Sequence, residues 1–120
     1  MAQEPPEAEQ LFERLAGRFL ADPAVSRGTG FGSNPGLRVG GKIFAMLGQG
    51  GELVVKLPRE RVDELVASGA GQRFDPRHDG RLMKEWATVH SRHAVDWEGL
   101  AGEALGFVRS VARGSPRGGG

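Results

Sequence analysis

The segment LRVGGKIFAMLGQGGELVVKL, residues 37–57, contains the clearest strand and turn signals in the chain. Two glycine-containing corners divide it into three apolar runs. The pair Gly40–Gly41 favours a two-residue hairpin, because glycine accepts the positive φ angles of a type I′ turn. The second corner, residues 48–51, has the composition of a four-residue loop. The stretch therefore predicts a three-stranded antiparallel meander.

The two corners also predict which residues face each other across the strands. Side chains alternate between the two faces of a sheet, so an error of one residue in either loop exchanges the faces of a strand. The expected pairs are Val39 with Lys42, Arg38 with Ile43, Leu37 with Phe44, Met46 with Leu53, Ala45 with Val54, Phe44 with Val55, and Ile43 with Lys56.

This register gives the meander two unlike faces. One is apolar and is expected to line the core. The other mixes apolar and charged side chains, which fits a partly covered sheet or a docking surface, and the partly covered sheet is the favoured interpretation. The core face holds Leu37, Val39, Lys42, Phe44, Met46, Leu53, Val55 and Leu57, and the mixed face holds Arg38, Ile43, Ala45, Leu47, Glu52, Val54 and Lys56.

Helix and strand patterns flank the meander. Pro58 and Gly69 are typical of the start and end of a helix, and Asp96 is a good N-cap. The element order predicts an α+β fold: an N-terminal helix, a three- to four-stranded antiparallel meander, a helix, further strands and a C-terminal helix. Outside the meander we expect a helix from residue 7 to near 22, strands over 25–31, 72–75 and 81–89, a helix that opens at Pro58 and stops near Gly69, and a helix over 97–111.

The last expected helix carries three glycines, Gly99, Gly102 and Gly106, on the side opposite its apolar stripe. Each is expected to destabilise the helix by about 0.5–1 kcal/mol relative to alanine. Core packing does not explain them. Neutral drift and close packing of a partner on this side both stay open.

Length and composition limit the classes of protein. We expect one domain over residues 1–112, with residues 1–6 loose and the Gly/Arg-rich residues 113–120 disordered. The chain has no cysteine, which excludes disulfides, Cys-ligated zinc and thiol catalysis and fits a cytoplasmic protein. No apolar run approaches the roughly 20 residues that span a membrane. A net charge of +1 gives no global attraction to nucleic acid.

Motifs for catalysis and for cofactors are missing. Ser33 stands where a dinucleotide fingerprint needs glycine, and Ile43 stands where a phosphate-binding P-loop needs serine or threonine. His90 and His93 are close in sequence, but two histidines without further ligands are not a zinc signature. No serine lies in a Gly-x-Ser-x-Gly nucleophile elbow. We therefore expect no catalytic residue, no cofactor and no metal.

Basic residues form the one group that points to binding. Several lie on the strand–turn–strand segment 73–85 and at the start of the helix after Pro58. Arginine suits bidentate contacts to phosphate or carboxylate, although interspersed acidic residues neutralise part of the charge. The candidate surface for an anion or partner consists of Arg38, Lys56, Arg59, Arg61, Arg73, Arg77, Arg81 and Lys84.

Several short motifs carry a family resemblance: Phe31–Gly32, GKIFA at 41–45, VKLP at 55–58, Arg61 and MKEW at 83–86. With them the chain resembles the TfoX (Sxy) N-terminal domain family, which is similar in turn to the MmcQ/YjbR proteins, over about residues 11–107. The resemblance implies an α+β domain. It also implies a link to regulation, because TfoX proteins act in natural competence, and to DNA, because YjbR relatives carry a double-wing topology linked to DNA binding.

These observations predict a small cytoplasmic, non-enzymatic domain that binds a macromolecular partner, either protein or nucleic acid, in a regulatory role. The alternative is a domain that binds a small anionic ligand, or an enzyme, with a cleft beside the 73–85 turn and His78. A homodimer through the sheet edge or the glycine side of the last helix is a third alternative. No membrane partner is expected.

Overall fold

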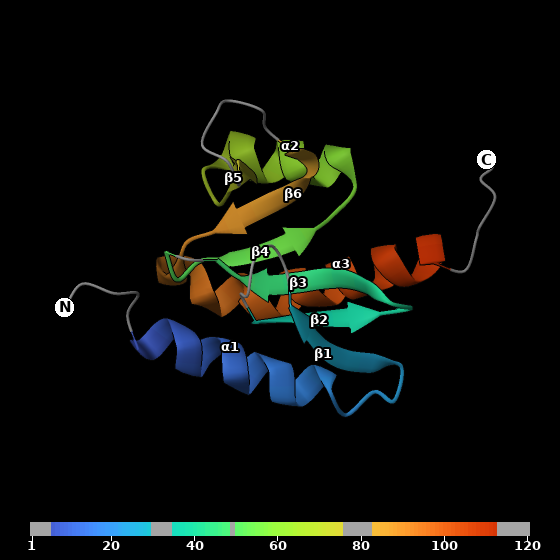
Figure 1. Ribbon diagram of the computed structural model, residues 1–120. Coiled ribbons are helices and arrows are strands. Elements are labelled where there is room, and N and C mark those ends of the chain that lie inside the picture. The colour runs from blue at the N-terminus through green and yellow to red at the C-terminus, as the bar shows by residue number, and fades with distance from the viewer. Residues whose placement is uncertain (1–5, 30–34, 49, 76–82, 113–120) are drawn as a thin grey trace.

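The structure is a computed structural model that describes residues 6–29, 35–48, 50–75 and 83–112. Its elements confirm the expected α+β class (Figure 1). In chain order they are α1 (Pro6–Phe19), β1 (Val25–Thr29), β2 (Pro35–Val39), β3 (Lys42–Leu47), β4 (Leu53–Lys56), α2 (Arg59–Ser68), β5 (Gln72–Phe74), β6 (Met83–Val89), the short 3₁₀ helix η1 (Ser91–Asp96) and α3 (Trp97–Ala112).

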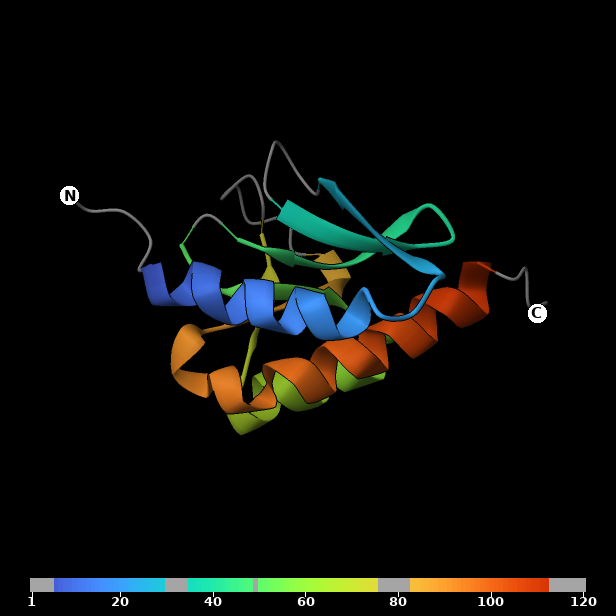
Figure 2. The ribbon, with the colours of Figure 1, turned by 90° about the horizontal axis from the view of Figure 1, so that it is seen from below.

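The strands form one six-stranded antiparallel sheet in the order β1-β2-β3-β4-β6-β5. The first four strands follow one another as hairpins. The chain then passes through α2, enters the far edge as β5, and returns as β6 beside β4. Figure 2 shows the three helices together on one side of the sheet. Apolar side chains from all three helices and from this side of the sheet form the main core, in which Phe12, Phe44 and Val62 are fully buried.

The first hairpin confirms the turn predicted at Gly40 and Gly41, whose φ angles are 60° and 79°. Val39 faces Lys42 and Arg38 faces Ile43, as expected. The next predicted pair is wrong, because a β-bulge places Leu37 opposite Ala45 instead of Phe44. The bulge lets the neighbours Phe44 and Ala45 both enter the core, where the Phe44 ring meets Phe19 edge-on with centroids 5.9 Å apart.

The second corner is one residue longer than predicted. Leu53 faces Leu47, not Met46, and Gly48 N–H donates to the Glu52 carbonyl at 2.7 Å to close the loop. Glu52 therefore belongs to the loop and not to the strand. The longer loop shifts the β3–β4 register by one residue. The pairs expected for Ala45 with Val54, Phe44 with Val55 and Ile43 with Lys56 are replaced by Ala45 with Val55 and Met46 with Val54.

The face assignment changes for three residues. Met46, expected in the main core, lies on the other face, while Ala45 and Leu47 lie in the core and not on the mixed face. The remaining apolar core-face assignments hold. β3 has one extra residue at the bulge and the loop has one extra residue, so the residues of β2 and β4 still face the sides that were predicted. The confirmed core residues are Leu37, Val39, Phe44, Leu53, Val55 and Leu57.

The other face of the sheet carries a second, smaller apolar cluster. Met46 and Val54 are fully buried there and pack with Trp86, Ile43 and Phe74. Because the centre of this face is buried, it is a partly covered sheet and not an open docking surface, which supports the favoured interpretation.

The helix ends follow the sequence closely except before α3. Pro58 is the N-cap of α2, and Gly69 ends that helix in the left-handed conformation with φ of 82°. Residues 91–96, expected as loop, instead form η1, so Asp96 is the last residue of η1 and not the N-cap of an isolated helix. The 3₁₀ turn begins at His90, whose Nδ1 accepts the Arg92 N–H at 3.0 Å.

One further element is shorter than predicted. Helix α1 ends at Phe19, and the Asp22 side chain accepts the Ala24 N–H at 2.9 Å in a local turn that competes with further helix. Pro6, which was predicted to belong to the loose residues 1–6, is the first residue of α1. Residues 1–5 and the predicted tail 113–120 lie outside the described ranges. Within those ranges, no helix combines the length and apolar character required to cross a bilayer.

A candidate anion-binding groove at the start of α2

Four of the predicted surface residues come together where α2 begins beside β6. Lys56, Arg59 and Lys84 line a hollow of about 780 Å³, and Arg59, Arg73 and Lys84 line an adjoining hollow of about 400 Å³. The two hollows share Arg59 and Lys84, so they form one continuous surface. We call it the basic groove, defined by Lys56, Arg59, Arg73 and Lys84.

Strand pairing places two of these cations. Lys56, the last residue of β4, pairs with Trp86 of β6. Lys84 precedes Trp86 by two residues on the same strand, and both line the same hollow. Pro58 then turns the chain into α2, which sets Arg59 in the first turn beside this face.

Ion pairs neutralise only part of the groove. Lys56 Nζ lies 3.3 Å from a Glu85 carboxylate oxygen, and Arg73 pairs with Asp63 of α2. Within the described part of the chain, Arg59 and Lys84 form no ion pair. The acidic Glu60 also lines the groove, and it too forms no ion pair with a described residue. Counting only ion pairs between described residues, the groove therefore offers two free cations against one free carboxylate.

The start of α2 adds a second favourable field for an anion. Pro58 is the N-cap but makes no side-chain capping hydrogen bond, and Pro58, Arg59 and Glu60 all line the groove. The first N–H groups of a helix have no acceptor inside the helix and carry its positive dipole end. A cation in the first turn is unfavourable for the helix alone, but an anion in the groove would contact both Arg59 and the first N–H groups of α2.

Trp86 limits the chemistry of the groove. The side chain is 9% exposed, with Lys56 Nζ 5.3 Å from its ring centroid and the Phe74 ring at 6.5 Å. A base cannot stack on a ring that is already covered. The groove can thus form charge-assisted hydrogen bonds with oxyanions, but Trp86 does not offer a stacking platform.

The structure separates the other predicted residues from the groove. Arg38 lies on β2, two strands away from Lys56, and donates to the Thr29 carbonyl at 3.4 Å. Arg61 points toward α3, where hydrogen bonds to Glu103 at 2.8 Å and to Glu64 at 2.9 Å raise its pKa. Neither residue contributes to the groove. Arg77, Arg81 and His78 fall in residues 76–82, outside the described ranges.

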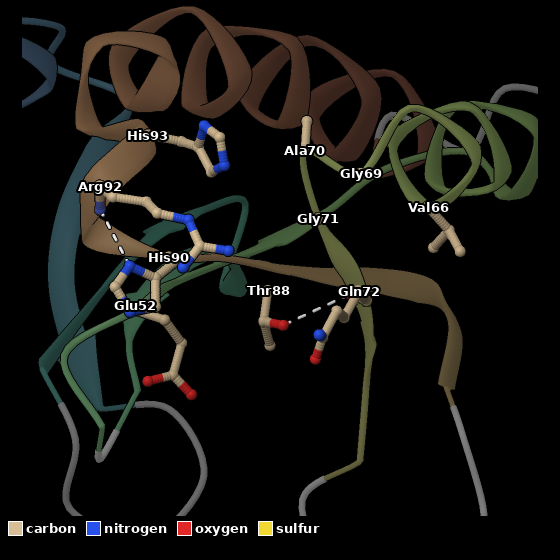
Figure 3. Close-up of a pocket in the computed structure, with 10 residues that line it drawn as sticks. All are labelled: Glu52, Val66, Gly69, Ala70, Gly71, Gln72, Thr88, His90, Arg92 and His93. Atoms are coloured by element: carbon tan, nitrogen blue, oxygen red, sulfur yellow. Dashed lines mark hydrogen bonds between the residues drawn. The ribbon is translucent and has the colours of Figure 1, made fainter.

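A polar pocket at the opposite end of α2 was not predicted. It measures about 550 Å³ and is lined by the end of α2, by β5 and β6, and by η1 (Figure 3). His90 and His93 both line it, so the histidine pair was visible in the sequence, but only the fold shows that Glu52 and Arg92 join them. Among the residues that the structure describes, no group of three or more His, Cys, Asp or Glu could hold a metal ion.

Comparison with known proteins gives one result. A protein-family model described as YjbR matches residues 20–102, which span β1 to the first half of α3 and include the whole sheet. No curated protein and no solved structure matches the chain.

Proposed function

Since this chain belongs to the YjbR family, we propose that it is a non-enzymatic domain whose basic groove binds the phosphate backbone of a nucleic acid. A domain of this kind acts by occupying its site, so the proposed role is regulatory. The motifs shared with the TfoX N-terminal domains are compatible with this role. A cytoplasmic location is part of the proposal, because a chain without cysteine suits a reducing compartment.

The observation that carries the proposal is the pair of free cations at the start of α2. Arg59 and Lys84 line both hollows of the groove and have no ion pair in the described ranges. Phosphate contacts by arginine and lysine supply most of the affinity of sequence-independent binding to nucleic acid. The helix start beside Arg59 adds N–H donors that are suited to the same oxygens.

The covered Trp86 favours nucleic acid bound through its backbone over single strands bound by base stacking. Proteins that bind single strands without sequence preference rely on aromatic platforms, and Trp86 has Lys56 and Phe74 against its ring. A protein partner with an acidic surface would use the same cations. Duplex DNA is therefore the ligand to test first, with protein as the alternative outcome.

The test compares charge reversal in the groove with a matched reversal elsewhere. Arg59→Glu with Lys84→Glu removes the free cations, and Arg14→Glu with Lys42→Glu makes the same change in net charge at exposed positions outside the groove. We expect fluorescence anisotropy with a short labelled duplex to show affinity at least about tenfold lower for the groove variant. The control variant is expected to stay within about twofold of the native chain. Equal losses in both variants would show that only net charge matters.

A second candidate function, a small anionic ligand or a reaction in the same groove, is favoured by the concavity near the 73–85 segment. An active site is expected to hold a group with a displaced pKa. Among the residues that the structure describes, the groups whose pKa is clearly displaced are Asp22 and Arg61, and both lie outside the groove lining. The pKa of Asp22 is lowered by the Ala24 N–H and by Arg109, and that of Arg61 is raised by Glu103 and Glu64, so both displacements come from structural contacts.

A further inference from the structure

The polar pocket at the C-terminal end of α2 is separate from the basic groove. The groove lies where α2 and β6 begin, and this pocket lies where both elements end, at Gly69–Gly71, Thr88 and His90. Its volume of about 550 Å³ falls within the usual range of roughly 300–1,000 Å³ for small-molecule sites. It can therefore be considered as a binding site in its own right.

Hydrogen-bond donors converge on the pocket from η1. Figure 3 shows the guanidinium of Arg92 projecting toward Thr88 and Gln72, with the His93 ring on the neighbouring side. Within the described ranges, neither of these two side chains has a hydrogen bond or ion pair. Because His90 Nδ1 accepts the Arg92 N–H at 3.0 Å, Nε2 is the nitrogen that carries hydrogen in the neutral ring. Three donor side chains thus face one cavity.

The carboxylate among the lining residues is turned to the rim. A Cβ added at Gly48 would lie 2.8 Å from Glu52 Oε2, and one at Gly50 would lie 2.8 Å from Oε1, so the carboxylate rests over the 48–51 corner. Figure 3 shows it pointing away from the Arg92 guanidinium. Glu52 therefore does not occupy the donors, and it leaves them available to a ligand.

The end of α2 does not oppose an anion strongly. The last carbonyls of a helix carry its negative dipole end and would repel one. Here the Leu65 carbonyl accepts N–H groups of Ala70 and Gly71 at 3.0 and 3.1 Å, and the Val66 carbonyl accepts that of Gly69 at 3.2 Å. These capping bonds use the carbonyl lone pairs and reduce the repulsion.

The backbone segments that carry the donor side chains are held in place by hydrogen bonds and close packing. Trp97 Nε1 donates to the His90 carbonyl at 3.3 Å, and the His93 N–H donates to the same carbonyl at 2.9 Å. On the opposite wall Gly71 lies so close to β6 that an added Cβ would be 3.0 Å from the Thr88 carbonyl oxygen. Because the donor side chains extend from a backbone that is already fixed, less conformational entropy is lost when a ligand binds.

We propose that this pocket binds a small metabolite through one oxyanion group, a carboxylate or a phosphate, with Arg92 as the main contact and His93 beside it. The guanidinium offers a planar pair of donors that matches either oxyanion. The cavity is larger than one such group, so the rest of the ligand lies along Gln72 and Val66. This inference does not depend on nucleic-acid binding in the basic groove.

The test is a residue-resolved titration of the full chain by ¹H–¹⁵N NMR, with inorganic phosphate and acetate as separate probes. At least one probe is expected to give saturable shifts at residues 69–72 and 88–93, and which probe does so identifies the oxyanion. Arg92→Ala is expected to weaken that binding about tenfold or more, since a charge-assisted hydrogen bond is lost. Arg14→Ala, an exposed arginine on α1, is the control and is expected to leave it unchanged.

Two results would overturn the assignment. One is the absence of saturable shifts at these residues with either probe, and the other is an equal response in Arg92→Ala and the native chain. Shifts confined to residues 56–60 and 84 would report the basic groove, so a failure of this inference is distinguishable from a failure of the proposed function. Arg92 is exposed, and unchanged thermal unfolding of Arg92→Ala verifies that the variant is folded.

Discussion

Substituting alanine for two glycines of α3 tests what covers the outer side of this helix. A Cβ added at Gly99 or at Gly106 would find no atom within 4 Å apart from the adjacent helix backbone, and both positions are exposed. The structure thus places no described group on these two residues. If nothing else covers them, Gly99→Ala and Gly106→Ala relieve the entropic penalty of glycine in a helix and introduce no clash.

The magnitude follows from helix propensity. Each substitution is expected to stabilise the protein by about 0.5–1 kcal/mol, so the double variant gains about 1–2 kcal/mol. For a domain of this size that free energy raises the thermal midpoint by roughly 4–8 °C. Gly71→Ala is the matched control and is expected to destabilise, because its Cβ would lie 3.0 Å from the Thr88 carbonyl oxygen and 3.4 Å from Leu65 Cβ.

The assay is thermal unfolding followed by circular dichroism at two protein concentrations, with light scattering on the same samples. A midpoint that rises equally at both concentrations supports an uncovered helix side. A lower midpoint, with a loss that grows with concentration, would refute the reasoning. It would show that a second copy of the chain packs on the glycines.

Three further predictions concern the stability of the fold. Phe44→Ala removes a fully buried ring that meets Phe19, and it is expected to lower the free energy of unfolding in urea by about 3–5 kcal/mol; a loss below about 1 kcal/mol would contradict the core assignment. Gly69→Ala places a Cβ at φ of 82° and is expected to lose about 1 kcal/mol in the same assay, whereas no loss would contradict the left-handed cap. The pKa of Asp22 lies below its ordinary 3.8 because of the Ala24 N–H and Arg109. Its contribution to the free energy of unfolding is therefore complete above pH 3.8 and is lost as the pH falls through the lowered pKa. The stability difference between the native chain and Asp22→Asn should therefore shrink in acid, and a difference independent of pH would refute the contact.

The sequence predicts the fold where a residue type dictates the backbone. Glycines that adopt positive φ located the hairpin at Gly40–Gly41 and the end of α2 at Gly69, and the apolar alternation then identified most of the core. The bulge at Phe44 left no such signal, because its cause is the space that the core offers two neighbouring side chains. The second loop was misjudged at Glu52, which joins the loop by accepting the Gly48 N–H.

The candidate site could also be predicted only in part from the sequence. The sequence grouped basic residues of the 73–85 segment with those at the start of the helix after Pro58, and the structure brings Arg59, Arg73 and Lys84 together beside Lys56. Arg61 was grouped with them although it faces α3, because the direction of a helical side chain depends on the packing of that helix, which sequence spacing does not specify. The pocket around Arg92 was missed for a similar reason, since it needs η1 and the end of α2 side by side.

The most direct test of the account is the salt dependence of duplex binding, measured for the native chain and for Arg59→Glu with Lys84→Glu. Each phosphate neutralised by a free cation contributes about −0.9 to the slope of log affinity against log salt concentration. Phosphate binding by both cations should give a slope of about −2 or steeper for the native chain and a slope that is shallower by about 2 in the variant. A native slope near zero, or the same slope in both proteins, would contradict the proposal that these two cations bind the phosphate backbone.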